Sequence, residues 1–267
     1  MLRRIENINA QTAEQLLGVL PQSLMTAFTL FALLDWCAVD GAWVQSDEQE
    51  QVTALVVQKD QTKAYVSVGE NADFEELALF LRHLGGLVIH CAPDYTARLG
   101  VTPFSRHSFM VLSETPEPGK AAVSVTDTNA LRPVFDLLTQ SARAAAGDSA
   151  QFRKYSERAF QEWLSRTSRG MLGGYTAVKA VYAAENSLLS AAIADTLGQY
   201  VYIRDVATDR DYRKMGYGSD CVRGLCADLK QADNQIFLLC DDLKTERFYQ
   251  KSGFARQGSV ELGIVEL

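Results

Sequence analysis

A glycine-rich turn between a strand and a helix constrains the fold of this chain more than any other feature of its sequence. Residues 199–207 are rich in aromatic and β-branched side chains, which is typical of a strand, and residues 217–232 carry apolar side chains at helical spacing. The turn between them, residues 213–218, reads Arg-Lys-Met-Gly-Tyr-Gly. A strand that leads through such a turn into a helix predicts a fold in which helices pack on a sheet.

The start of a helix is a suitable place for a phosphate group. Several backbone N–H groups lack partners there, the helix dipole is positive, and glycines allow close approach to the backbone. Two better-known phosphate loops do not fit. The dinucleotide fingerprint needs a third glycine where Cys221 stands, and no Gly-Lys-Ser or Gly-Lys-Thr sequence of the Walker type exists. Taken alone, Gly-x-Gly is also compatible with a plain tight turn.

The elements around the turn predict an α+β fold of mixed strand direction. Short polar turns separate three strands and favour an antiparallel meander, and the glycine turn then begins a βαβ-like unit. The resulting order is β-α-α-β-β-β-α-β-α-β. Strands are predicted at residues 121–125, 175–183, 187–195, 199–207, 236–240 and 254–267, and helices at 127–141, 151–166, 217–232 and 245–252.

A polar segment with two prolines and a glycine, residues 114–120, is predicted to be a linker between residues 1–113 and 121–267. The first part shows a faint version of the same element order, which indicates an internal duplication. An unrelated α+β domain is the alternative. Helices are predicted here at 12–20, 22–35 and 74–84, and strands at 41–44, 52–58, 63–68 and 87–91.

Composition excludes several classes of protein. A net charge of −7 does not suit a binder of duplex nucleic acid, which needs a concentrated basic face. The most apolar stretch, Leu24 to Leu34, is too short to span a membrane, and the N-terminus lacks the apolar core of a secretory signal. We therefore expect a cytoplasmic protein with no membrane or nucleic-acid partner. None of the five cysteines forms a CxxC pair, so we expect buried thiols and no metal site.

Two longer strings carry a resemblance to a known family. The string from Val206 to Gly218, Val-Ala-Thr-x-x-x-Tyr-Arg-x-x-Gly-Tyr-Gly, resembles motif A of the GNAT acetyltransferase superfamily. The segment from Phe248 to Phe254 resembles the Tyr-x-x-x-Gly-Phe segment of the same family. The resemblance covers residues 121–267. It implies the GNAT fold, a central, mixed and mostly antiparallel sheet flanked by helices, beside a smaller N-terminal domain that resembles a degenerate copy.

The resemblance also implies acetyl-CoA as cofactor and a role for individual residues. Tyr249 is expected to protonate the departing thiolate. The family often has Asn and a small residue where this chain has Asp242 and Thr245, which puts cofactor contacts on that side in doubt. Residues expected to contact the pantetheine arm are Val206, Ala207 and Thr208, and those expected to hold the pyrophosphate are Arg213, Lys214, Met215, Gly216, Tyr217, Gly218 and Ser219.

Asp205 is the catalytic base that we predict, and Asp195 on the neighbouring strand is a second candidate. An acceptor amine with a pKa of ~10 must lose a proton before it attacks. Strict alternation places Asp205 on the apolar face of its strand, and a bulge would change that facing. An ordinary salt bridge with Arg204 or Arg213 is the alternative role. All three histidines precede residue 108, so a Cys–His nucleophile is not expected in residues 121–267.

The function expected from these residues is transfer of an acetyl group from acetyl-CoA to a primary amine by direct attack. The acceptor, a small-molecule amine or a peptide, stays open, as does the choice between monomer and homodimer. In the N-terminal half, residues 69–73 are acidic where phosphate binding needs N–H groups and cations, so we expect no coenzyme A there. The alternatives are a non-catalytic regulatory module that binds acyl-CoA and a structural interaction protein.

Overall fold

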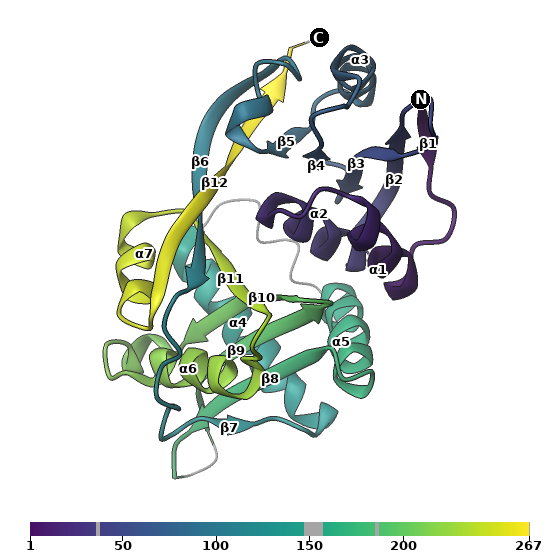
Figure 1. Cartoon of the computed structure of the whole chain (residues 1–267). Coiled ribbons are helices and arrows are strands. Elements are labelled where there is room, and N and C mark those ends of the chain that lie inside the picture. The colour runs from purple at the N-terminus through teal and green to yellow at the C-terminus, as the bar shows by residue number, and fades with distance from the viewer. Residues whose placement is uncertain (36–37, 147–156, 185–186, 267) are drawn as a thin grey trace. The chain divides into compact units, whose positions relative to one another are not determined.

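The computed structural model describes residues 1–35, 38–146, 157–184 and 187–266, and Figure 1 shows their helices and strands. The chain divides into two compact units. Unit 1 consists of Met1–Phe109, Leu239–Leu243 and Arg256–Leu267, and unit 2 consists of Met110–Leu238 and Lys244–Ala255. None of the helices in the described part of the chain has the length and hydrophobicity that crossing a membrane requires.

The sheet of unit 1 is mixed and has helices on both faces. Its strands are β1 (Leu2–Arg4), β2 (Val39–Ser46), β3 (Val52–Lys59), β4 (Lys63–Val68), β5 (Val88–Cys91), most of β6 (Val101–Leu112) and most of β12 (Phe254–Val265). They lie in the order β1–β2–β3–β4–β5–β12–β6. Strands β1 to β4 are antiparallel, β4 and β5 are parallel, and β5 and β12 are antiparallel. The helices are α1 (Ala10–Val19), α2 (Leu24–Leu34) and α3 (Phe74–Leu84).

Local sequence signals explain where the helices of unit 1 begin and end. The side chains of Asn9, Ser23 and Asp73 each accept a hydrogen bond from a backbone N–H of the first turn. Helix α3 crosses over between the parallel strands β4 and β5, and its Leu77 packs on Val66 in the core. Because neighbouring residues of a strand point to opposite faces, Tyr65 points the other way, toward α2.

Unit 2 repeats this plan around the glycine turn. Its strands are β7 (Val123–Ser124), β8 (Thr176–Tyr182), β9 (Leu188–Leu197), β10 (Tyr200–Thr208) and β11 (Gln235–Cys240), and its helices are α4 (Leu131–Ala146), α5 (Glu157–Leu172), α6 (Tyr217–Leu229) and α7 (Leu243–Gln250). Strands β7 to β10 are antiparallel, and β10 and β11 are parallel. Helix α6 makes the crossover, as α3 does in unit 1.

Helices cover both faces of the sheet in unit 2. Val178 and its neighbours along β8 and β9 pack on α4 in one core. Lys179, the next residue of β8, lies on the opposite face, where its methylene groups approach Gly224 of α6. After α7, which ends at Gln250, Gly253 takes a positive φ of 89°. The glycine turn connects the end of β10 to the start of α6.

Most predicted elements of residues 121–267 are confirmed in kind, with shifted ends. The predicted helix at 127–141 begins only at Leu131, after a short 3₁₀ helix over Thr128–Ala130. The start of the predicted helix at 151–166 lies outside the described residues. The predicted helix at 245–252 is α7, two residues earlier. Cys91, Cys221, Cys226 and Cys240 are buried free thiols as expected, and Cys37 lies outside the described residues.

Two long-range features differ from expectation. Strand β6 extends over Val101–Leu112, where no strand was predicted. The sequence shows no strand pattern there because the first half of β6 is mostly exposed and contains Pro103. The predicted boundary at 114–120 separates residues 1–113 from 121–267, whereas Arg256–Leu267 groups with unit 1. The reason is pairing: Glu261 to Ile264 of β12 run antiparallel to β5.

An aromatic pair occupies the same place in both units. Tyr65 of β4 lies beside His90 of β5 in the parallel register, with ring centroids 4.6 Å apart. Tyr202 of β10 lies beside Phe237 of β11, with centroids 5.2 Å apart. Both nitrogens of His90 are buried without a hydrogen-bond partner among the described residues. Burial, with a smaller effect of nearby Lys63, lowers the pKa of His90 to about 3.

Replacing His90 with phenylalanine, the residue of the matching place in unit 2, is expected to make the protein more resistant to acid. Below pH 6.5, the ordinary histidine pKa, His90 binds a proton in the unfolded chain. In the folded chain His90 binds that proton only below about pH 3. The free energy of unfolding therefore falls by about 1.4 kcal/mol per pH unit in that window. His90→Phe should remove this loss in urea unfolding between pH 7 and pH 4. The control is His83→Phe at an exposed position of α3. An unchanged pH dependence in His90→Phe would contradict the assignment.

Candidate functional site

Strand β10 has one edge that is only partly covered by another strand. Its parallel pairing with β11 ends at Tyr202, opposite Phe237. Its antiparallel pairing with β9 continues to Thr208, opposite Ser190. From Ile203 to Thr208, therefore, the edge of β10 on the β11 side has no strand partner among the described residues. Such an edge presents backbone N–H and C=O groups to an extended ligand.

A bulge interrupts β10 at the start of this open edge. Ile203 lies opposite Ala194 and Asp205 lies opposite Ile193, so Arg204 is an extra residue without a partner on β9. Residues that lie opposite each other point to the same face of the sheet. Because Ala194 and Ile193 point to opposite faces, Ile203 and Asp205 do so too. The bulge thus removes Asp205 from the face of Ile203, where strict alternation had placed it.

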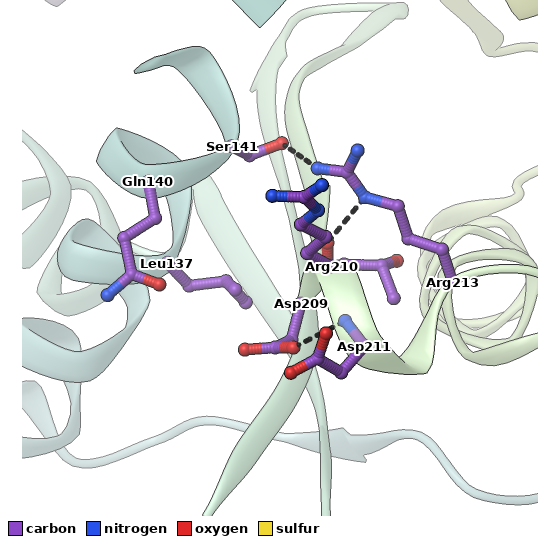
Figure 2. Close-up of a pocket in the computed structure, with 8 residues that line it drawn as sticks. Leu137, Gln140, Ser141, Asp209, Arg210, Asp211 and Arg213 are labelled. Atoms are coloured by element: carbon purple, nitrogen blue, oxygen red, sulfur yellow. Dashed lines mark hydrogen bonds between the residues drawn. The ribbon is translucent and has the colours of Figure 1, made fainter. Parts of the chain in front are cut away.

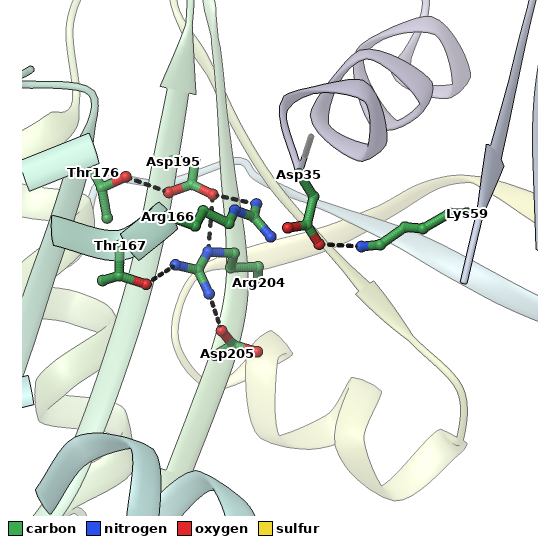
Figure 3. A network of polar contacts seen from close by, with 8 residues as sticks. All are labelled: Asp35, Lys59, Arg166, Thr167, Thr176, Asp195, Arg204 and Asp205. Carbon is green, nitrogen blue, oxygen red and sulfur yellow. Dashed lines mark hydrogen bonds and ion pairs between the residues drawn. The ribbon is translucent and has the colours of Figure 1, made fainter. Parts of the chain in front are cut away.

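The extra arginine lies at the centre of a network of polar contacts (Figure 3). Its side chain is 7% exposed. Arg204 donates from Nε to Asp195 Oδ2 at 2.8 Å and from Nη2 to Thr167 Oγ1 at 3.1 Å, and its Nη1 forms an ion pair with Asp205 Oδ2. The salt bridge that the sequence allowed between Arg204 and Asp205 is therefore present.

Asp195 is bound from three sides. It accepts hydrogen bonds from Arg166 at 2.8 Å and Thr176 at 2.6 Å, in addition to the bond from Arg204. Burial by itself would raise the pKa of Asp195, but the two guanidinium groups and the Thr176 hydroxyl outweigh burial and hold the pKa below its ordinary value. Asp195 therefore stays ionised and occupied, which makes it a poor proton acceptor.

Asp205 differs from Asp195 in its access to solvent. The side chain of Asp205 is 33% exposed. Only its Oδ2 is engaged, by Arg204, and its Oδ1 has no hydrogen bond among the described residues. Of the two candidate bases, Asp205 is the one whose carboxylate has a free oxygen to receive a proton.

The glycine turn has the backbone geometry that its sequence suggests. Lys214 and Gly216 have positive φ values of 67° and 92°. A Cβ atom added to Gly218 would lie 2.9 Å from Thr208 Oγ1 and 3.5 Å from the ring of Phe248. Gly216 is therefore required by its conformation and Gly218 by close packing.

The backbone N–H groups of the turn have no internal partners. The first hydrogen bond of α6 runs from the Asp220 N–H to the Gly216 carbonyl, at 3.0 Å. Within the described part of the chain, no hydrogen bond uses the N–H groups of residues 214–219. Residues 211–216 are exposed, so side chains do not cover the turn. The unpaired N–H groups and the positive end of the helix dipole suit an anionic ligand.

The side chain of Arg213 turns away from these N–H groups (Figure 2). Its Nε donates to the Thr208 carbonyl at 3.2 Å and its Nη2 donates to Ser141 Oγ of α4 at 3.4 Å. The sequence suggested that the Arg213 guanidinium binds a phosphate. In the structure it instead connects the turn to β10 and α4 through these two hydrogen bonds. A pocket of about 550 Å³ lies beside these two hydrogen bonds. It is lined by Leu137, Gln140, Ser141, Thr208, Asp209, Arg210, Asp211 and Arg213.

Tyr249 lies in an aromatic group on α7. It is 8% exposed and makes edge-to-face contacts with Phe248 and Phe254, at centroid distances of 4.9 and 5.8 Å. Phe248 is also the ring that approaches Gly218, so this group borders the turn. Sequence reasoning overlooked Phe248, and it overlooked Arg166, Thr167 and Thr176 in the polar network. A single sequence gives no sign that Arg166 and Thr167 of α5 approach β10.

Comparisons with known proteins agree with this geometry. Residues 133–254 match the model of the acetyltransferase (GNAT) family. The fold resembles a GCN5-related N-acetyltransferase from Sphaerobacter thermophilus (14% identity, 98% of this chain and 94% of that chain, TM-score 0.58). It also resembles a GNAT-family acetyltransferase from Colwellia psychrerythraea (11% identity, all of both chains, TM-score 0.62) and a tandem GNAT protein from the clavulanic acid biosynthesis pathway (11% identity, 98% and 97%, TM-score 0.63). No curated protein sequence matches the chain.

Replacing Asp195 with asparagine is expected to lower the free energy of unfolding by about 3 kcal/mol at pH 7, because buried Arg204 and partly buried Arg166 lose the carboxylate that they share. The folded-state pKa of Asp195 is depressed, so its contribution is complete above the ordinary value of 3.8 and is lost as the pH falls through the lower folded value. Urea unfolding from pH 7 to pH 2.5 measures the difference. The control Asp136→Asn removes an exposed partner of Arg132 and should cost less than about 1 kcal/mol. Equal stability of Asp195→Asn and wild type at pH 7 would contradict this reading.

Proposed function

Because residues 133–254 form a domain of the acetyltransferase (GNAT) family, we propose that this protein is an N-acetyltransferase that passes an acetyl group from acetyl-CoA to a primary amine. Family and fold support acyl transfer from acyl-CoA in general. The observation that carries the proposal is the turn of residues 213–219, which is exposed as far as Gly216. The N–H groups of residues 214–219 have no partner among the described residues, and the turn adjoins the open edge of β10. A diphosphate and an extended amide-bearing arm need these two features side by side.

The residues present fit acetyl-CoA. Six residues of β10, from Ile203 to Thr208, follow the last pair with β11 and leave an edge for the amides of a pantetheine arm. At Gly216 nothing lies within 4 Å of an added Cβ, so the backbone there is open to a pyrophosphate. Lys214 is exposed and adds a positive charge to the turn. We assign the arm to Val206, Ala207 and Thr208 and the pyrophosphate to Lys214, Met215, Gly216, Tyr217, Gly218 and Ser219, while the side chain of Arg213 holds the turn against Thr208 and Ser141.

Three groups of this chain perform the proposed chemistry. When bound, acetyl-CoA supplies an activated acetyl thioester. Asp205 Oδ1 takes the proton of the acceptor ammonium, which has an ordinary pKa of ~10 and must be neutral to attack. The backbone N–H of Val206 donates to the carbonyl oxygen as it gains negative charge. The Tyr249 hydroxyl gives a proton to the departing sulfur, and the second proton that the nitrogen loses as the amide forms restores the hydroxyl. A thiolate leaves readily, so most of the rate comes from alignment of the two reactants.

For unit 1 we propose a second, degenerate GNAT-like lobe that holds no coenzyme A. Support comes from the repeated topology and from the likeness to a tandem GNAT protein over 98% of this chain. The turn after β4 is closed: the Gly69 N–H donates to the Thr53 carbonyl at 2.8 Å, and a Cβ on Gly69 would lie 3.0 Å from Pro21. Glu70 and the acidic first turn of α3 repel anions.

The binding test uses two glycine variants that carry the same backbone strain. Gly216→Ala and Gly174→Ala each place a side chain at positive φ, 92° and 75°, with nothing within 4 Å of the new Cβ. Each should lose about 1–2 kcal/mol of stability. Only Gly216→Ala should weaken acetyl-CoA binding in calorimetry, by at least about tenfold, because the methyl group stands where the diphosphate approaches. Equal affinity of both variants would refute the assignment of the turn.

Turnover separates an enzyme from a regulatory module that binds acyl-CoA without reacting. Thiol release from acetyl-CoA, followed over a panel of amines and short peptides, should rise above the rate without acceptor for at least one class. Binding without acceptor-dependent release would favour the regulatory module. Absence of binding would favour a structural interaction protein.

Replacing Tyr249 with phenylalanine is expected to lower kcat by about tenfold and to leave acetyl-CoA affinity within about twofold, because the ring still packs while the proton donor is lost. Tyr95→Phe, which removes a hydroxyl from the ring that packs on Phe74 in unit 1, is the control. Steady-state kinetics measures kcat, and calorimetry measures the affinity for acetyl-CoA. Wild-type kcat in Tyr249→Phe would remove the hydroxyl from the mechanism.

A further inference from the structure

We propose that Arg204 is a positioning residue, which holds Asp205 so that the carboxylate presents Oδ1 to the acceptor amine. This inference rests on the proposed function. It assigns a catalytic purpose to the bulge in β10, which places an arginine and the aspartate that follows it beside each other. In a regular strand two consecutive side chains point to opposite faces and do not pair.

Contacts with residues other than Asp205 hold the guanidinium of Arg204 in place. Its Nε and Nη2 bind Asp195 and Thr167, which leaves Nη1 to contact Asp205 Oδ2. Asp195 is itself held by Thr176 of β8 and Arg166 of α5. A rigid chain of contacts thus connects α5 and β8 to the one exposed carboxylate of the group.

The ion pair with Arg204 holds the Asp205 carboxylate by its Oδ2 atom. At 33% exposure the Asp205 side chain would otherwise sample several rotamers, and only some of them turn an oxygen toward an acceptor. With Oδ2 engaged by Arg204, Oδ1 is the oxygen of this carboxylate that has no hydrogen bond to any residue that the structure describes. Holding a reacting group in its productive orientation removes an entropic part of the barrier.

The network also keeps Arg204 paired throughout the reaction. When Asp205 takes the acceptor's proton, it ceases to be an anionic partner. Arg204 then still has Asp195, whose depressed pKa keeps it ionised at neutral pH. The buried guanidinium is never left without a counter-ion, so its position does not change as Asp205 gains and loses a proton.

The test is a double-mutant cycle of wild type, Arg204→Lys, Asp205→Asn and the double variant. Lysine keeps the charge but presents one nitrogen, which cannot bind all three partners in place. We expect kcat to fall about tenfold in Arg204→Lys and about a hundredfold in Asp205→Asn. The double variant should match Asp205→Asn within about twofold, because Arg204 acts only through that carboxylate. Calorimetric affinity for acetyl-CoA should stay within about threefold in all four proteins.

A matched control comes from an arginine outside the site. Arg132→Lys changes an exposed arginine of α4 that pairs with Asp136 and Glu157, and it should leave kcat unchanged. If Arg204→Lys folds poorly, Thr167→Val serves instead. It removes the contact between Thr167 and Arg204 and should lower kcat about threefold in the wild-type background and not at all beside Asp205→Asn.

The outcomes distinguish this inference from the function on which it rests. Losses in kcat that multiply in the double variant would show that Arg204 does not act through Asp205 and would overturn the proposal. Loss of acetyl-CoA affinity in Arg204→Lys as large as its loss of kcat would overturn it too. Full activity of Asp205→Asn would refute both Asp205 and Arg204 while leaving the transferase intact. A wild-type protein that transfers acetyl to no amine would refute the proposed function itself.

Discussion

The bulge in β10 is the constraint on which the rest of the site depends. Without the extra residue Arg204, Asp205 would point with Ile203 to the same face of the sheet. The bulge also stands directly after the last residue of β10 that pairs with β11, Tyr202. Bulges bend a strand and increase its local twist, and both effects draw β10 away from its parallel neighbour. The bulge therefore stands where the open edge begins, and it also determines that Asp205 does not share the face of Ile203.

The glycine turn depends on the same strand from its other end. Thr208, the last residue of β10, contacts the turn twice: its carbonyl accepts from Arg213 and its hydroxyl lies against the space beside Gly218. A side chain at position 218 would press on the Thr208 hydroxyl, which would have to move. The contacts of Thr208 with Arg213 and with the space beside Gly218 therefore hold the open edge and the unpaired N–H groups next to each other.

Local features of this fold follow from the sequence, and features of long range do not. The period of α3, the period of α6 and the glycine turn itself are decided by neighbouring residues, and pattern reasoning finds them. The caps at Asn9 and Ser23 are local too, but the predicted helices at 12–20 and 22–35 miss them. The pairing of β12 with β5 joins residues about 170 positions apart, and no local signal specifies it. The contact of Thr167 with Arg204 is equally invisible, because a helix shows which face is polar but not which strand that face meets.

The two units show how one topology can keep or close such a surface. In unit 1 the parallel pairing of β4 with β5 runs from Lys63 to Val66, so only two residues of the six-residue strand extend beyond it. In unit 2 six of the nine residues of β10 do so. Unit 1 then uses the Gly69 N–H for a bond to Thr53, where unit 2 leaves its turn unpaired. A longer ladder and one internal hydrogen bond leave unit 1 without the open edge and the unpaired turn that unit 2 shows in its described residues, so this difference between the units lies in the backbone.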